Sequence, residues 1–254
     1  MNKKLGETRL NKQGTIMKIV RYGSYTDIDG EFMDEFHYIK EHQTYSNFKT
    51  GGIKNPYDRT TYGVGYLGDG IYMAKENNKI VEGYRVWHDI MRRCYSEHSK
   101  DRFPAYYHIC TVSEEWHNYQ NFAKWFNDNK YEVNERLHID KDILCQGNKK
   151  YCEEMCMLVP QRINMLFSNK RNKRGLPNGI QKNKKGYLAK YNGEELGRFS
   201  TLEEAYTVYS KAKKNAIITI ANEYKNQIPE EVYNALLNYE VRIENDKNYT
   251  IAQI

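Results

Sequence analysis

The segment from residue 137 to residue 167 contains side chains whose types and spacing could form a catalytic centre. It reads LHIDKDILCQGNKKYCEEMCMLVPQRINMLF and carries His138, Asp140, Asp142 and Asn164. Asp140 and Asp142 stand two residues apart, so a regular strand would place both carboxylates on one face, where they could bind a metal ion together. The alternative interpretation is a charged strand end for the two aspartates and an ordinary surface or core residue for His138.

The same segment predicts the elements that would position these residues. The runs LHIDKDIL and MCMLV predict two strands, the loop between them contains Gly147, and Pro160 suits the opening of a helix. Two amphipathic helices precede them, in YRVWHDIMRRCY and NYQNFAKWF, because their apolar residues recur at helical spacing. We expect these helices to form a hydrophobic core together with Trp87, Trp116 and Trp125.

This region resembles the HNH-type endonucleases of phages and mobile introns. The homing members of that family end their motif with N-L-x-W-V-T-x-x-x-N, and residues 155 to 160 with Asn164 fit that register. His138 and Asp140 match the opening H-x-D of the motif, and the upstream blocks WHDIMRRCY and VSEEWHNYQNF carry the same resemblance. The resemblance implies hydrolysis of DNA phosphodiester bonds, which requires an activated water and a hard cation with oxygen ligands.

Carried over position by position, the resemblance makes His138 the general base toward water. It makes Asn164, with Asp140 or Asp142, the ligands of one divalent cation, Mg²⁺ or Mn²⁺, and Asn148 a residue of the loop or a further ligand.

Two positions depart from the family pattern. Met155 replaces the central Asn that fixes the loop, and Lys141 stands where a D-H pair would place its His. An alternative alignment on the IDKDIL core leaves His138 outside the site, and that alignment has no obvious base.

The cysteines predict reduced thiols. Five cysteines cannot all pair, and their uneven spacing does not suggest the disulfide framework of a secreted protein. Cys152 and Cys156 lack a matching second pair of ligands, so we expect buried structural thiols and no zinc site.

Residues 179 to 227 predict three short strands followed by one helix. Glycines and the Asn192–Gly193 pair divide the strands, and Thr201 with Glu204 forms a capping box. An apolar stripe would lay the helix on one face of the sheet; it consists of Ala205, Val208, Tyr209, Ala212, Ala216, Ile220 and Tyr224. The side chains available to line the other face are Lys182, Lys184, Tyr187, Lys190 and Arg198. A solvated basic surface is the alternative interpretation of these residues.

This segment is similar to the ethylene-response-factor (Apetala-two) DNA-binding domain, which also occurs fused to phage endonucleases. The similarity rests on GIQK at residue 179, GYLAKY at residue 186, LGRFSTLEEAY at residue 196 and the small-residue helix. It implies a sheet that enters the major groove of double-stranded DNA. Because this sheet is poorer in Arg and Trp than the plant domains, phosphate contact is better supported than base readout.

The joint before this segment concentrates positive charge. The chain has a formal net charge of +6, and residues 170 to 190 hold eight Lys or Arg and no Asp or Glu. Lys170, Arg171, Lys173 and Arg174 could therefore follow a phosphate backbone, with an affinity that falls as salt rises. A flexible, solvated linker is the alternative.

These patterns predict a modular α+β protein. We expect a small β-rich module at 1–60, broken by glycines and plausibly a β-barrel, in which TIMKIVRYGSY and TYSNFKTGGI are strand-forming runs. The HNH-like ββα region with flanking helices spans 61–168, a basic linker 169–178, and the DNA-binding module 179–254. A last helix in PEEVYNALLNYEVR, with Val232, Leu236 and Tyr239 on its apolar face, would act as a cap or as a homodimer contact.

The expected function is that of a metal-dependent DNA endonuclease of the homing type. The alternative is a DNA-binding protein without nuclease activity that retains the HNH-like scaffold, with RNA or protein binding as weaker options. No stretch approaches the roughly 20 apolar residues that span a bilayer, and residues 1–11 lack an apolar signal core. We therefore expect no membrane partner and a cytoplasmic location, in a phage-infected bacterial host.

Overall fold

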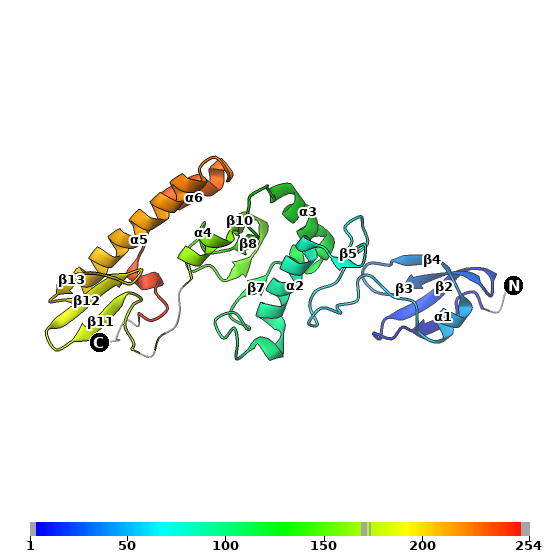
Figure 1. Cartoon of the computed structure of the whole chain (residues 1–254). Helices are drawn as coiled ribbons and strands as arrows, with labels where there is room; N and C mark the ends of the chain where they lie inside the picture. The colour runs from blue at the N-terminus through cyan, green and yellow to red at the C-terminus, as the bar shows by residue number, and fades with distance from the viewer. Residues whose placement is uncertain (1–3, 169–171, 173, 250–254) are drawn as a thin grey trace. The chain divides into compact units, whose positions relative to one another are not determined.

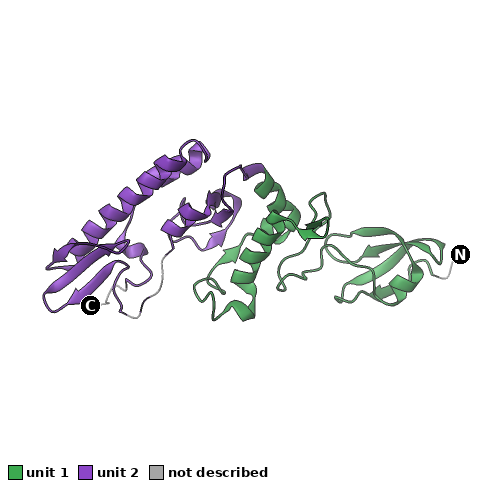
Figure 2. Ribbon diagram, in the orientation of Figure 1, with its two compact units in different colours: residues 1–127 green, residues 128–254 purple. Residues whose placement is uncertain are grey.

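The computed structural model describes residues 4–168, 172 and 174–249 of a mixed α+β chain (Figure 1). The chain divides into two compact units, residues 1–127 and residues 128–254, which are shown in different colours in Figure 2. Within the described residues, no helix is long and apolar enough to cross a membrane.

The first unit begins with an antiparallel four-stranded sheet in sequence order. Its strands are β1 (Thr8–Leu10), β2 (Ile16–Ser24), β3 (Asp27–Phe32) and β4 (Ile39–Gln43). Met17, Ile19, Ile28 and Phe32 are fully buried on one side of it. In the described residues β1 and β4 each pair with one neighbour only, so the module is an open sheet and the expectation of a barrel was wrong.

The run TYSNFKTGGI forms a helix, α1 (Tyr45–Lys49), so the prediction of a strand there was wrong. The Thr44 side chain accepts a hydrogen bond from the backbone N–H of Asn47 and thereby caps the first turn. Tyr45 and Phe48, three residues apart, then point together into the core of the sheet.

The rest of the first unit is built around two helices, α2 (Glu82–Tyr95) and α3 (Tyr119–Asn129), where the sequence predicted them. Trp87, Trp116 and Trp125 are buried as expected, and the Trp87 indole N–H donates to the carbonyl of Trp116 at 2.7 Å. The connecting segments hold β5 (Lys75–Glu76), β6 (Lys79–Ile80), η1 (Glu97–Ser99), β7 (Thr111–Val112) and η2 (Glu115–His117).

The second unit opens with a strand, loop, strand and helix, as predicted. Strand β8 (Leu137–Asp140) pairs antiparallel with β10 (Met157–Pro160), and α4 (Gln161–Leu166) follows directly. The loop between the strands contains β9 (Lys150–Tyr151) and η3 (Glu153–Met155). Strand β8 is shorter than the LHIDKDIL run, because the Asp140 carboxylate accepts the backbone N–H groups of Asp142 and Ile143 and turns the chain.

A three-stranded antiparallel sheet with one covering helix completes this unit. It consists of β11 (Ile180–Asn183), β12 (Gly186–Tyr191) and β13 (Glu194–Phe199), and α5 (Leu202–Tyr224) lies against it (Figure 1). Asn192 and Gly193 have φ of 52° and 91°, the left-handed pair that a tight hairpin requires. Both hydrogen bonds of the predicted capping box are present at Thr201 and Glu204.

Helix α5 takes part in two hydrophobic cores. Ala205, Tyr206 and Tyr209 near its start pack with Ile180 and Ala189 of the sheet. Ile217, Ala221 and Tyr224 near its end pack with the ββα region and with α6 (Glu230–Asn238), which precedes η4 (Ile243–Asn245).

Because it has two partners, the buried face of α5 shifts around the helix along its length. Ala205, Tyr209 and Tyr224 of the predicted stripe are buried, whereas its other members are only half-buried. Interior positions fall instead to Tyr206, Lys213, Ile217 and Ala221. In α6, Val232 and Leu236 are buried as predicted, and Tyr239 is the residue that ends the helix.

The capping box gives the first testable prediction. Thr201→Ala removes the acceptor of the Glu204 backbone N–H and should lower the free energy of unfolding of the second unit by about 1 kcal/mol. Thr207→Ala is the matched control, because exposed Thr207 only donates to the Glu203 carbonyl one turn earlier in the same helix. Urea denaturation followed by circular dichroism measures both. Equal stabilities would show that the cap contributes nothing.

Candidate catalytic site and nucleic-acid interface

The ββα region brings His138 and Asn164 into contact. His138 lies on β8 opposite Val159 of β10, and α4 packs over this face of the strand pair through the fully buried Ile163. The Asn164 side chain, one residue further along α4, reaches the ring of His138 with 3.0 Å between Nδ2 and Nδ1. Two residues that are 26 positions apart in the chain therefore share one partly buried site.

The orientation of the Asn164 side-chain amide is linked to which ring nitrogen of His138 carries the proton. In the structure the amide NH₂ group of Asn164 faces Nδ1 and donates to it. A neutral His138 ring then carries its proton on Nε2. If the amide is turned over, its oxygen accepts from Nδ1–H, and Nε2 then holds the lone pair that general-base chemistry needs. The pair can therefore fix a tautomer and orient the ring.

Helix α4 has only six residues, and contacts at its start hold it over the strands. The Glu135 carboxylate accepts the backbone N–H of Arg162 at 3.0 Å and also the hydroxyl of Tyr224 on α5. The backbone N–H of Gln161 donates to the carbonyl of Arg136 at 3.0 Å. The position of Asn164 thus depends on residues before β8 and on α5.

The Asp140 carboxylate stabilises the turn that follows β8. It lies two residues after His138 on β8 and is 8 % exposed, and its Oδ1 accepts both N–H groups of the following turn at 2.8 and 2.7 Å. Burial raises the pKa of Asp140, and the two amide hydrogen bonds oppose that rise. Asp142 lies outside β8 and pairs with the Lys141 ammonium at 2.9 Å, so the expected pair of carboxylates on a regular strand was wrong.

Asn148 ties together the two ends of the loop. Its Nδ2 donates to the carbonyls of Lys141 and Lys150, and its Oδ1 accepts the backbone N–H of Lys150 at 2.8 Å. The buried Lys141 ammonium donates to the carbonyl of Asn148. Met155, at the position of the family's central Asn, is 37 % exposed. Asn148 therefore acts as a loop residue, one of the two roles expected for it.

The donors around His138 fit a cation that keeps most of its water ligands. They are the amide oxygen of Asn164 and the carboxylate of Asp140, whose Oδ1 already accepts two backbone N–H groups. Mg²⁺ is commonly held by one or two protein oxygens with several waters, so this sparse set is compatible with it. Over the described residues, this region contains no group of three His, Cys, Asp or Glu side chains within coordinating distance of one another.

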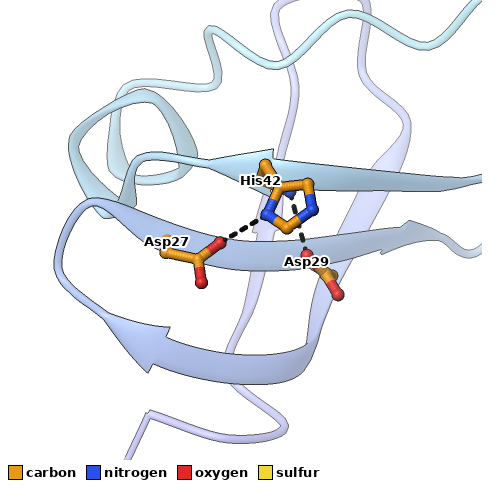
Figure 3. Close-up of side chains that lie close together, drawn as sticks. All are labelled: Asp27, Asp29 and His42. Carbon is orange, nitrogen blue, oxygen red and sulfur yellow. Dashed lines mark hydrogen bonds and ion pairs between the residues drawn. The ribbon is translucent and has the colours of Figure 1, made fainter.

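One such group lies in the first unit instead and consists of Asp27, Asp29 and His42 (Figure 3). Arg21 donates to both carboxylates, at 2.7 Å to Asp27 and 2.5 Å to Asp29. These hydrogen bonds hold the pKa of both carboxyls below the usual range. The guanidinium already supplies the positive charge, so we interpret the group as an ion-pair network.

The buried cysteines of the loop, Cys152 and Cys156, are free thiols. Burial raises the pKa of both, which keeps them protonated at neutral pH.

The register of the C-terminal sheet divides the predicted DNA-binding residues between its two faces. Ile180 pairs with Ala189, and both are buried against α5. Lys182 pairs with Tyr187 two positions along, so these two residues also lie on the helix side. The expectation that both would line the open face was therefore wrong.

The open face carries fewer uncompensated charges than the sequence suggested. Its cross-strand neighbours are Gln181, Leu188 and Arg198, with Lys190 beside Glu195. Arg198 is exposed, whereas the Lys190 ammonium pairs with the Glu195 carboxylate at 3.0 Å.

The remaining predicted contacts lie in connections. Lys184 is exposed in the two-residue turn between β11 and β12, and Arg174 is exposed before the sheet. Lys170, Arg171 and Lys173 lie outside the described residues.

Comparisons with protein-family models, curated proteins and solved structures found no match to this chain.

The two candidate roles of Asp140 predict different responses to substitution. Asp140→Asn keeps an oxygen for the two backbone N–H groups and removes a buried charge. In EDTA-containing buffer at pH 7 its free energy of unfolding should therefore equal or exceed that of the wild type. Because burial raises the pKa of Asp140 in the folded protein, this advantage should shrink as pH falls toward the ordinary range of an Asp. Asp140→Ala leaves both N–H groups without their acceptor and should cost about 2 kcal/mol.

Urea titrations between pH 4 and pH 8 measure these differences. An Asp140→Ala protein that is as stable as the wild type at pH 7 would contradict the loop role.

Proposed function

We propose that this protein is a DNA-binding, HNH-like endonuclease of the phage homing type that hydrolyses phosphodiester bonds with a divalent metal, Mg²⁺ or Mn²⁺. The observation that carries the proposal is the contact between His138 and Asn164 at 3.0 Å within a strand, loop, strand and helix arrangement. The substrate is double-stranded DNA inside the cell of a phage-infected bacterium.

In the proposed reaction the Asn164 amide oxygen accepts from Nδ1–H, and Nε2 of His138 takes a proton from the water that attacks phosphorus. The P–O bond to the leaving strand breaks, and the leaving oxygen is protonated by solvent. A divalent cation would supply charge at the scissile phosphate, held by Asn164 with Asp140. Asn148 supports the proposal because it closes the loop between the strands although Met155 replaces the central Asn.

The runner-up function is DNA binding without cleavage. It is favoured by the engagement of Asp140 with two backbone N–H groups and by the ion pair between Lys141 and Asp142. Both contacts reduce the carboxylate oxygen available to a metal ion.

Cleavage is tested with supercoiled plasmid in Mg²⁺, Mn²⁺ or EDTA. The wild type should nick the plasmid only with metal, and His138→Ala and Asn164→Ala should each lower the rate at least about 100-fold, the usual contribution of a positioned general base. His98→Ala is the control, since His98 is exposed in the other unit. Plasmid that is bound but uncut under every metal condition supports the runner-up. Nicking that survives in both variants would contradict the assigned site.

DNA binding through the open face predicts opposite effects for two neighbouring charges. Arg198→Ala should weaken affinity for duplex DNA and reduce the slope of log K against log salt by about 1. Glu195→Gln should strengthen binding, because it removes a negative charge and releases Lys190. Lys182→Ala, on the helix side of the sheet, is the matched control and should change affinity less than Arg198→Ala. Fluorescence anisotropy at several salt concentrations measures all three, and equal losses for Arg198 and Lys182 would contradict the assignment of the reading face.

A further inference from the structure

Lys213 of α5 has a mostly buried side chain and no protein acceptor. It is 8 % exposed and lies one turn after Tyr209 and one turn before Ile217. Its ammonium nitrogen makes no hydrogen bond or ion pair with a residue that the structure describes, and it is not closed off from solvent. Such a group is satisfied by water or by a ligand.

The next residue in the helix shows the contrast. The Lys214 ammonium donates to three backbone carbonyls at and beyond the end of α6, those of Leu236, Leu237 and Tyr239. Lys214 therefore has a structural role that explains its position. Lys213 has no equivalent role.

Lys213 lines an open cavity of about 410 Å³ in the second unit. Arg162 of α4, Tyr191 of β12, Tyr209 of α5 and Asn178 before β11 contribute to the wall. The two tyrosine rings meet edge to face, with centroids 5.9 Å apart. The Arg162 guanidinium is already paired with the Glu223 carboxylate at 2.5 Å, so Lys213 supplies the uncompensated charge of the wall. A cavity of this size, with aromatic walls and one such ammonium group, suits a ligand that carries an anionic group.

The nearest acidic side chain does not neutralise Lys213 by contact. Asp246 raises the pKa of Lys213 by its charge, against the larger lowering caused by burial. Its carboxylate is already used by the backbone N–H groups of Asn178 and Asn248, each at 2.9 Å. The cavity thus presents an ammonium group that is open to water or to a ligand.

We propose that this cavity binds a phosphate group, with Lys213 as its main hydrogen-bond donor and Arg162, which is paired with Glu223, at the wall. The phosphate can belong to a DNA strand, in which case the inference rests on the proposed function, or to a free nucleotide or inorganic phosphate. The cavity is lined both by the ββα region and by the C-terminal sheet and helix, so a phosphate there would contact both candidate modules.

The test measures binding of three probes to the full chain: inorganic phosphate, deoxyadenosine monophosphate and a duplex oligonucleotide. Lys213→Met removes the charge and keeps an unbranched side chain of nearly the same length, and Lys211→Met is the matched control from an exposed position of the same helix. Thermal shift reports the two small probes, and fluorescence anisotropy reports the duplex. Lys213→Met should also melt at a higher temperature than the wild type without ligand, because it removes a charge that burial of the side chain disfavours.

A shift with either small probe that is lost in Lys213→Met and kept in Lys211→Met supports a free phosphate site, even if the protein does not bind DNA. A loss of at least about tenfold in duplex affinity, in Lys213→Met alone and without a small-probe shift, supports a backbone phosphate. Wild-type protein that responds to no probe, or responses that Lys213→Met leaves unchanged, would overturn the proposal. If Lys213→Met does not melt cooperatively, Lys213→Gln takes its place.

Discussion

The second unit depends on the burial of α5 in two hydrophobic cores. The start of this helix covers the three-stranded sheet, and its end packs with β10, α4 and α6. A single rigid helix can satisfy both only if its apolar face shifts along its length, which is why Tyr206 and Ile217 are interior although neither belongs to a regular stripe. The boundary between the two compact units, at residues 127 and 128, reflects this shared burial. It differs from the domain boundary near residue 168 that composition suggested.

The same helix bears on the candidate catalytic site. Tyr224 of α5 donates to Glu135, and Glu135 also caps the start of α4, from which Asn164 reaches His138. These contacts connect the C-terminal core with the imidazole. The loop beside it is stabilised separately by Asp140 and Asn148, which satisfy its backbone groups.

Specific contacts compensate part of the positive charge in this unit. Lys190 is paired with Glu195, Arg162 with Glu223, and Lys214 with backbone carbonyls. Arg198 on the open face and Lys182 and Lys184 on and beside the sheet are exposed. The charge that can meet an anion therefore lies at particular positions of the sheet.

The sequence by itself determined the local elements of this protein. Periodicity located α2, α3 and α6, the Asn192–Gly193 pair located a hairpin, and the capping box located the start of α5, because each signal depends on neighbours within a few residues.

The Thr44 cap of α1 and the turn that engages Asp140 are local contacts too, although the composition of both segments suggested strands. Tertiary structure decided what these signals could not contain. The pairing register placed Lys182 and Tyr187 on the helix side of the sheet. The approach of His138 to Asn164 and the burial of Lys213 depend on packing between distant segments, which fixes a side chain's partners whatever its local propensity.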